Sequence, residues 1–319
     1  MNERDLGRSG LKTPPLVLGG NVFGWTADQR ASFAVLDAFV AGGGRMIDTA
    51  DAYSTWVPGH SGGESESIIG AWLAARGRRD DVLIATKVGM EIGGSKGLAP
   101  KRIATAAEAS LRRLQTDHID LYFAHIDDRD TPLEETLAAF DRLVREGKVR
   151  AIGASNYEAP RLAQALDSSA RAGVAAYAVL QPAYNLMDRT GFEGRLQALC
   201  RERGLGVVPY FGLASGFLTG KYRSEADLAG RPRAGMVKKY LTPRGFKVLE
   251  ALEIVARAQR ATMAQVALAW VAAQPGVTAP IASATSAAQV EELLGAMRIA
   301  LNAEQLALLD AASRPDEAP

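Results

Sequence analysis

Short apolar runs alternate with longer amphipathic segments along the 319 residues, and this repetition limits the chain to few folds. Short, continuous apolar runs are typical of parallel strands that are buried on both faces. The eight expected strands are 16–20, 45–48, 82–87, 119–125, 149–155, 178–181, 206–210 and 277–282. The seventh strand precedes a long loop, and the other seven precede expected helices at 32–41, 64–76, 100–114, 133–146, 160–172, 195–203 and 287–297.

Eight such units without a long internal linker predict an α/β fold, the (β/α)8 TIM barrel, formed as a single domain over residues 1–319. Three further amphipathic segments, 245–259, 262–274 and 302–312, predict extra helices packed outside the barrel. A doubly wound sheet is the alternative, and it would require G-x-G-x-x-G after its first strand. The sequence there is LGGNVFGW, which favours the barrel.

The overall charge gives little reason to expect a highly charged partner. The chain has 37 basic and 36 acidic residues and no basic stripe, so we expect no binding to nucleic acid or to an anionic membrane. A small, neutral substrate fits this balance better. Cys200 is the only cysteine, the first ten residues are polar, and no apolar run approaches the ~20 residues of a membrane span. These features predict a cytoplasmic protein.

Polar side chains gather at the carboxyl ends of the expected strands, where barrels of this type carry their chemistry. Asp48 ends the second strand, Lys87 the third and His125 the fourth, and Tyr53 lies in the loop after Asp48. A lysine buried at a strand end needs a carboxylate partner, and Asp48 on the neighbouring strand is suited to this. The ammonium of Lys87 would then lower the pKa of Tyr53 towards the range of a general acid.

Each of these residues also has an ordinary structural interpretation. Asp48 alone could cap a loop, Lys87 could be solvated at the barrel rim, His125 could be a core imidazole, and Tyr53 a loop aromatic. Four such residues at successive strand ends favour a site. We expect no metal in it.

Several stretches resemble the aldo-keto reductase family, and the resemblance extends over essentially the whole chain. The similar stretches are IDTADAY (47–53), GGESESIIG (62–70), ATKVG (85–89), LYFAH (121–125), residues 131–157 and FLTGKY (217–222). They are similar to the bacterial branch related to the potassium-channel β-subunits. The resemblance implies that Asp48, Tyr53, Lys87 and His125 form a catalytic tetrad. It also implies an NAD(P)H-dependent reduction of an aldehyde or ketone, in which Tyr53 donates the proton and His125 orients the carbonyl.

The same resemblance implies where the cofactor would lie, extended across the barrel mouth. Ser155, Asn156 and Gln181 would bind the nicotinamide carboxamide, and Tyr210 would stack on its ring. The segment 211–221 would wrap the pyrophosphate, with contacts from Phe211, Gly212, Leu213, Ser215 and Lys221. Thr285 and Gln289 would face the 2′-phosphate and Glu292 the adenine.

Two departures from the family pattern concern this cofactor site. Phe211 and Gly212 stand where many members have Ser-Pro, and Leu293 replaces a frequent asparagine. Many members carry basic residues near the 2′-phosphate, and the neutral residues here offer less discrimination between the two cofactors. NADPH is still expected, because neutral versions of this site also occur in NADPH-binding relatives, with NADH as the alternative. Two structural interpretations also stay open: residues 155–156 could cap the following helix, and residues 289–292 could form an exposed helix face.

Trp25 and Trp56 lie in loops above the expected site and could line a pocket for a small-molecule carbonyl substrate. Phe23, Met90 and Tyr240 could contribute, and all five could equally be loop packing. Two other functions stay open: a redox-sensing, NADP(H)-binding regulatory subunit of low turnover, and an aldolase with a Schiff base on Lys87. The sequence leaves the oligomeric state open.

Overall fold

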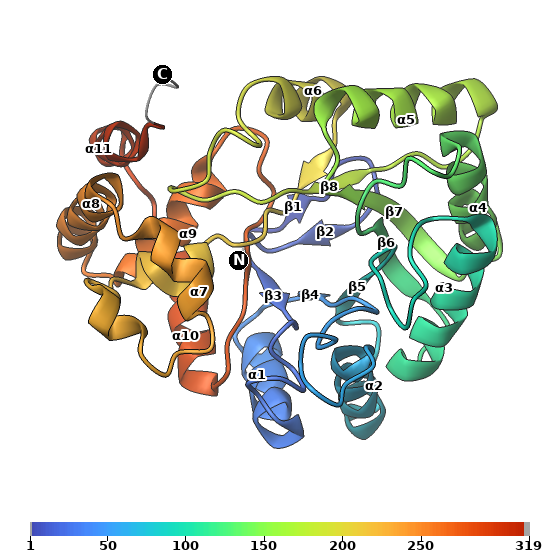
Figure 1. The fold of residues 1–319 in the computed structure, drawn as a ribbon, viewed down its shortest axis with the longest axis horizontal. Helices are drawn as coiled ribbons and strands as arrows, with labels where there is room; N and C mark the ends of the chain where they lie inside the picture. Colours follow the sequence, from blue (N-terminus) through green and yellow to red (C-terminus); the bar gives the residue numbers. More distant parts are fainter. Residues whose placement is uncertain (1, 316–319) are drawn as a thin grey trace.

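The barrel strands are parallel and follow one another around the barrel in chain order (Figure 1). The structure is a computed structural model that describes residues 2–315, so residues 1 and 316–319 of the predicted domain lie outside it. The sheet order is β10-β3-β4-β5-β6-β7-β8-β9. Its members are β3 Val17–Gly19, β4 Met46–Asp48, β5 Leu83–Val88, β6 Ile119–Ala124, β7 Val149–Ser155, β8 Val179–Gln181, β9 Gly206–Val207 and β10 Ile281–Ala282.

Backbone hydrogen bonds close this sheet into a ring. Thr278 N donates to Val207 O at 2.8 Å, and Ile281 N donates to Pro209 O at 2.8 Å, which joins the approach to β10 to the end of β9. The predicted (β/α)8 barrel is confirmed. The last two strands are shorter than the apolar runs 206–210 and 277–282 predicted, because these residues continue as irregular backbone that still bonds across the seam.

Helices surround the strands on the outside (Figure 1). Those of the repeating units are α1 Gln29–Ala41, α2 Glu64–Arg76, α3 Pro100–Leu114, α4 Leu133–Arg145, α5 Ala159–Ala172, α6 Arg195–Arg203 and α10 Ala287–Ala296. The first helix begins three residues before the predicted residue 32. Asp28 explains the difference, because its carboxylate accepts a hydrogen bond from Ala31 N at 2.8 Å and caps the helix.

The extra helices predicted outside the barrel are present as α8 Pro243–Gln259, α9 Met263–Ala273 and α11 Ala303–Ser313, and α8 packs against both α9 and α11. The segment predicted only as a long loop after β9 contains four short helical turns. They are η1 Ala214–Thr219, η2 Glu225–Leu228, α7 Ala234–Val237 and η3 Lys238–Tyr240. Within residues 2–315, no helix combines the length and the apolar character that crossing a membrane requires.

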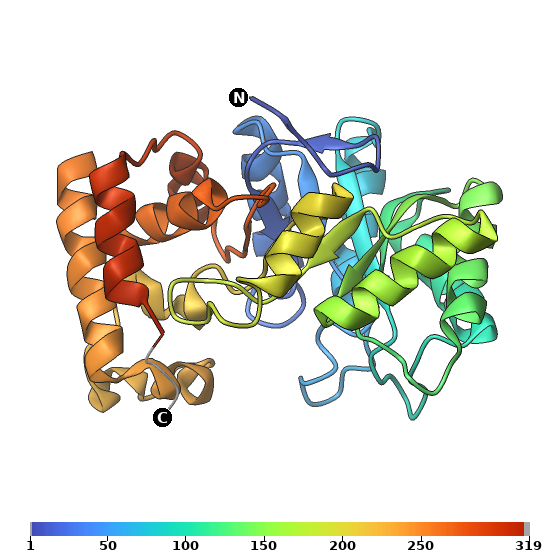
Figure 2. The same cartoon turned by 90° about the horizontal axis from the view of Figure 1, so that it is seen from above.

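An amino-terminal hairpin, which the sequence did not predict, fills one end of the barrel. Its strands β1 (Arg4–Asp5) and β2 (Lys12–Thr13) are antiparallel, and Leu6 and Leu11 between them pack into the barrel interior. Figure 2 shows this blue hairpin at one end of the molecule and the gold segment around α7 towards the other. The opposite, carboxyl end of the strands is therefore left for a site.

Candidate active site

The barrel brings the four predicted catalytic side chains together at the carboxyl ends of adjacent strands. Asp48 ends β4, Lys87 is the fifth residue of β5, and His125 follows β6 directly. Tyr53 returns to the same place from the loop after β4, where its hydroxyl lies 3.1 Å from Asp48 Oδ2. The parallel register, in which Asp48 pairs with Ala85, keeps these ends at one level.

Lys87 is the centre of this arrangement, and its side chain is fully buried. Its Nζ donates to Asp48 Oδ2 at 2.7 Å, to Thr49 O at 2.7 Å and to Tyr53 OH at 2.8 Å. An ammonium has three N–H groups, so each has an acceptor. Burial lowers the pKa of Lys87, and the adjacent Asp48 carboxylate opposes that change. The buried charge is therefore held by Asp48.

The pKa of Tyr53 moves in the direction opposite to the prediction. Burial, followed by the negative charge of Asp48 and its hydrogen bond to the hydroxyl, raises the pKa of Tyr53 well above its ordinary value. The prediction that Lys87 would bring this pKa down is wrong, because the hydroxyl is buried and Asp48 contacts it as closely as Lys87 does. Tyr53 is consequently a neutral phenol near neutral pH and can donate its proton.

His125 is a neutral imidazole in this site. Burial and then the charge of Lys87 lower the pKa of His125 well below its ordinary value. Its ring lies 6.0 Å from the Tyr53 ring, edge to face, and its Nδ1 has no hydrogen-bond partner within the described residues. A neutral imidazole carries one N–H, which can be donated to a carbonyl oxygen.

The residues predicted to hold the nicotinamide lie on the strands next to the tetrad. Ser155 Oγ donates to Gln181 O at 2.8 Å, and Gln181 Nε2 donates to Asp48 Oδ1 at 2.8 Å. Asn156 Nδ2 donates to the backbone oxygen of His125 at 2.9 Å, and Tyr210 OH donates to Asn156 Oδ1 at 2.7 Å. The interpretation of residues 155–156 as a helix cap is wrong, because α5 begins at Ala159.

Past Tyr210 the chain makes an unusual turn at the predicted pyrophosphate segment. Phe211, Ala214 and Ser215 have φ values of 61°, 47° and 58°, in the left-handed region that non-glycine residues seldom adopt. The five predicted pyrophosphate contacts differ in exposure. Gly212 and Ser215 are buried, Leu213 is half-buried, and Phe211 and Lys221 are exposed.

The predicted 2′-phosphate and adenine residues lie at the start of α10. Gln289 is exposed, and its Oε1 accepts hydrogen bonds from Thr285 N at 2.8 Å and from Thr285 Oγ1 at 3.2 Å. Glu292 is half-buried one turn further along the helix. The amide group of Gln289 therefore closes the turn before the helix and still reaches solvent.

Aromatic side chains stand beside Tyr53. Trp56 is 49% exposed, and its ring lies 6.2 Å from that of Tyr53 and 5.5 Å from that of Trp25. Phe23 and Tyr240 do not line the substrate pocket, as had been considered possible. Phe23 is fully buried in the core, and Tyr240 is buried with its hydroxyl bonded to Asp188. Met90 is exposed, as a pocket residue would be.

Sequence reasoning missed Arg233, which follows the loop after η2. Its guanidinium lies 5.6 Å from the centre of the Trp25 ring, and burial lowers its pKa. Arg233 is half-buried, and no ion pair is found for it across residues 2–315. The sequence signal that could have found it is the pair of arginines in Arg231-Pro-Arg233, which lies in the long loop after the seventh expected strand.

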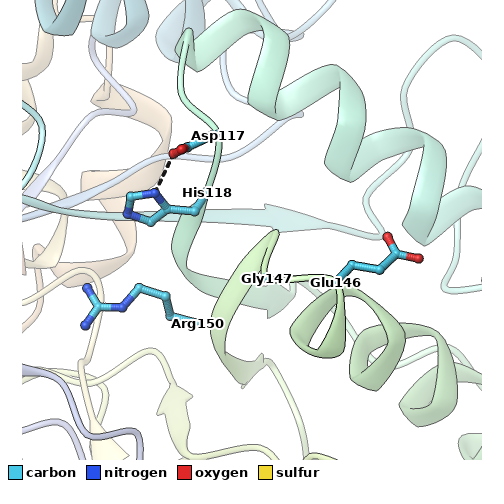
Figure 3. Close-up of a pocket in the computed structure, with 5 residues that line it drawn as sticks. All are labelled: Asp117, His118, Glu146, Gly147 and Arg150. Carbon is cyan, nitrogen blue, oxygen red and sulfur yellow. Dashed lines mark hydrogen bonds and ion pairs between the residues drawn. The ribbon is translucent and has the colours of Figure 1, made fainter.

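A shallow pocket lies at the other end of the barrel, where β6 and β7 begin. Asp117, His118, Glu146, Gly147 and Arg150 line it, and His118 Nδ1 is 2.7 Å from Asp117 Oδ1 (Figure 3). It shares no residue with the tetrad. Nowhere in the described part of the chain do three or more His, Cys, Asp or Glu side chains form a group that could hold a metal ion.

Comparison with known proteins identifies the class. The model of the aldo/keto reductase family matches residues 15–314, so the chain belongs to this family of oxidoreductases. The family resemblance inferred from the motifs is thereby confirmed. The roles of the individual residues stay predictions.

Curated relatives match over nearly their full lengths. The chain is 37% identical to the uncharacterized oxidoreductase YrpG of Bacillus subtilis (strain 168), covering 96% of this chain and 94% of the relative. It is 31% identical to a probable voltage-gated potassium channel subunit beta of Arabidopsis thaliana, covering 94% and 92%. It is also 30% identical to the L-glyceraldehyde 3-phosphate reductase of Escherichia coli (strain K12), covering 97% and 92%.

Proposed function

We propose that this protein reduces an aldehyde or ketone to an alcohol with a nicotinamide cofactor, preferably NADPH. The observation that carries the proposal is the contact of one buried ammonium, Lys87, with both Asp48 and the hydroxyl of Tyr53 at a barrel mouth. The family match supports the reaction class. A single cysteine, which can form no disulfide within the chain, fits a reducing compartment such as the cytoplasm.

The residues at the mouth fit a nicotinamide dinucleotide. Asn156 and Gln181 offer the amide groups that a carboxamide requires, and the guanidinium of Arg233, which has no ion partner among residues 2–315, fits a phosphate oxygen. Bound NADPH would supply a hydride to the carbonyl carbon. Thr285 and Gln289, which are neutral, fit the 2′-phosphate site less strongly than basic residues would, so NADH is the alternative cofactor.

Residues of the chain would bind the carbonyl oxygen and donate the proton to it. His125 donates its N–H to that oxygen and orients it. As negative charge builds on the oxygen, Tyr53 transfers its hydroxyl proton there, which completes the alcohol. Lys87 already donates to the oxygen of Tyr53 at 2.8 Å, so it stabilises the phenolate that remains. A phenol with a raised pKa can act here because the alkoxide is a much stronger base.

The test is Tyr53→Phe, which removes one oxygen atom from the site. We expect reduction of 4-nitrobenzaldehyde to fall by about 10³-fold or more, while NADPH still binds with unchanged affinity. The matched control is Tyr177→Phe, because among residues 2–315 the only hydrogen bond of the Tyr177 hydroxyl is to that of Tyr157, away from the tetrad. Retained turnover in Tyr53→Phe would refute the proposal.

A second function, a redox-sensing regulatory subunit, is supported by the similarity to a relative named as a probable potassium channel subunit beta. It predicts tight NADP(H) binding with negligible turnover of any carbonyl, so the assay above separates the two. The aldolase alternative is less well supported, because all three N–H groups of Lys87 are engaged and its charge is held by Asp48. Borohydride trapping on Lys87 would support it.

A further inference from the structure

A second group of ionisable side chains lies behind Lys87, on the opposite face of β5. Successive residues of a strand point to opposite faces, so Thr86 points away from the barrel interior that holds the Lys87 ammonium. Thr86 Oγ1 donates to Glu66 Oε1 of α2, and Arg113 of α3 donates to Glu66 Oε2 at 2.6 Å. Glu66 is fully buried and has partners for both oxygens.

Asp51 joins this group from the loop that leads to Tyr53. It is 2% exposed, and its backbone N donates to the carbonyl oxygen of Lys87 at 3.2 Å. Asp51 therefore lies against β5 at the residue that organises the tetrad. The nearest cation, Arg102 of α3, is 3.7 Å from Asp51 Oδ2, which is an ion pair without hydrogen-bond contact.

The carboxylate of Asp51 is poorly satisfied, in contrast to that of Glu66. Within the described residues, Asp51 Oδ1 has no hydrogen-bond partner, and neither does the buried hydroxyl of Tyr122 on β6. Burial and then the charge of Glu66 raise the pKa of Asp51 to about 7, against the opposing charges of Arg102 and Arg113. Burial and nearby carboxylates raise the pKa of Tyr122, which stays neutral.

We infer that Asp51 is a positioning residue for the proposed reaction, whose carboxylate supports the ammonium charge of Lys87 from behind the barrel wall. Three carboxylates favour the charged form of Lys87: Asp48 by direct contact, then Asp51 and Glu66 through space. Glu66 is neutralised by Arg113, and Asp48 is shared with Tyr53 and Gln181. Asp51 is the member of the set whose charge changes near neutral pH.

The consequence is a defined change in the pH profile. Burial already lowers the pKa of Lys87, so removal of the Asp51 charge lowers it further and Lys87 loses its proton at a lower pH. Activity should then fall earlier as the solution becomes alkaline. Below the pKa of Asp51 the wild-type carboxyl is protonated and neutral, as an asparagine side chain would be. The wild type and Asp51→Asn should therefore be alike at about pH 6, where the side chain is neutral in both, and should differ on the alkaline limb, where the wild-type Asp51 is charged and Lys87 loses its proton.

The experiment measures kcat for 4-nitrobenzaldehyde at saturating NADPH as a function of pH. In Asp51→Asn the alkaline limb of the kcat profile should shift to lower pH by about one unit. At a given pH on that limb, kcat should therefore be roughly tenfold lower than in the wild type. Asp51→Glu keeps the charge and should keep the wild-type limb. Asp117→Asn removes a carboxylate that is 93% exposed at the other end of the barrel, and should also keep it. Superimposable kcat profiles for the wild type and Asp51→Asn would overturn the inference. A kcat that is lower by the same factor at every pH would overturn it too.

A spectroscopic measurement covers the case in which Asp51→Asn fails to fold. Infrared difference spectra of the wild-type protein should show the C=O band of a buried, protonated carboxyl that disappears as the pH rises through about 7. The band should shift in Asp51→Glu, and its absence from the wild type would refute the inference. This titration requires no turnover, so an inactive wild type would refute the proposed function alone.

Discussion

Asp51→Asn should also change the free energy of unfolding, by an amount that depends on pH. A carboxyl whose pKa is raised by folding binds its proton more tightly in the folded than in the unfolded state. Stability is therefore lost as the pH rises from the unfolded value towards the folded one. For Asp51 these values are 3.8 and about 7, so the loss begins near pH 4 and is nearly complete near pH 8.

The magnitude follows from proton linkage at this one group. With these two values, ionisation of Asp51 costs the folded state about 2 kcal/mol at pH 5 and about 4 kcal/mol at pH 8. The variant lacks this titration. Its stability relative to the wild type should therefore increase by roughly 2 to 3 kcal/mol between pH 5 and pH 8.

Urea unfolding of the wild type and Asp51→Asn at a series of pH values would measure this difference. Asp117→Asn serves as the control again, because its carboxylate is exposed and its removal leaves the buried group intact. A difference between the wild type and Asp51→Asn that stays constant from pH 5 to pH 8 would refute the reasoning. A difference that grows in the opposite direction would show that Arg102 and Arg113 dominate over burial.

Three further substitutions test other contacts. Lys87→Met should lower the free energy of unfolding by about 3–5 kcal/mol in urea titrations, because Asp48 loses its ion partner while buried; a loss below about 1 kcal/mol would contradict the buried pair. Arg233→Ala should weaken NADPH binding at least about tenfold, measured by fluorescence titration, with the exposed Arg231→Ala as control; equal affinities would exclude Arg233 from the cofactor site. Gly7→Ala should lower the thermal midpoint much more than Gly10→Ala. Both glycines have positive φ, but only at Gly7 would a Cβ meet backbone, 2.2 Å from Gly206 N; equal losses would mean that φ alone matters.

The sequence predicted the repeating architecture well, because each unit carries its own local signal. The bounds of α2, α3 and α6 agree with the segments 64–76, 100–114 and 195–203. Their periodicity and flanking glycine or proline residues are properties of the chain itself. The amino-terminal hairpin gave no such signal, because two-residue strands are too short for a pattern and depend on Leu6 and Leu11 packing inside the barrel.

The candidate site was predictable in its membership but less so in its electrostatics. Asp48, Lys87 and His125 follow apolar runs, and that position at strand ends is visible in the sequence. The direction of the Tyr53 pKa was not visible, because it depends on burial of the hydroxyl in the folded barrel and on its contact with Asp48. Arg233 and the buried group around Asp51 were missed for a related reason, since their neighbours come from segments far apart in the chain.

The barrel and the position of four reactive side chains at its carboxyl end follow from the sequence, because burial pattern and strand ends are local features. The contacts among those side chains, and the charges that lie behind them, arise only when distant segments pack together. Burial and charge act through space in a low-dielectric interior, so the state of Tyr53, Lys87 and Asp51 depends on distances that no local pattern encodes.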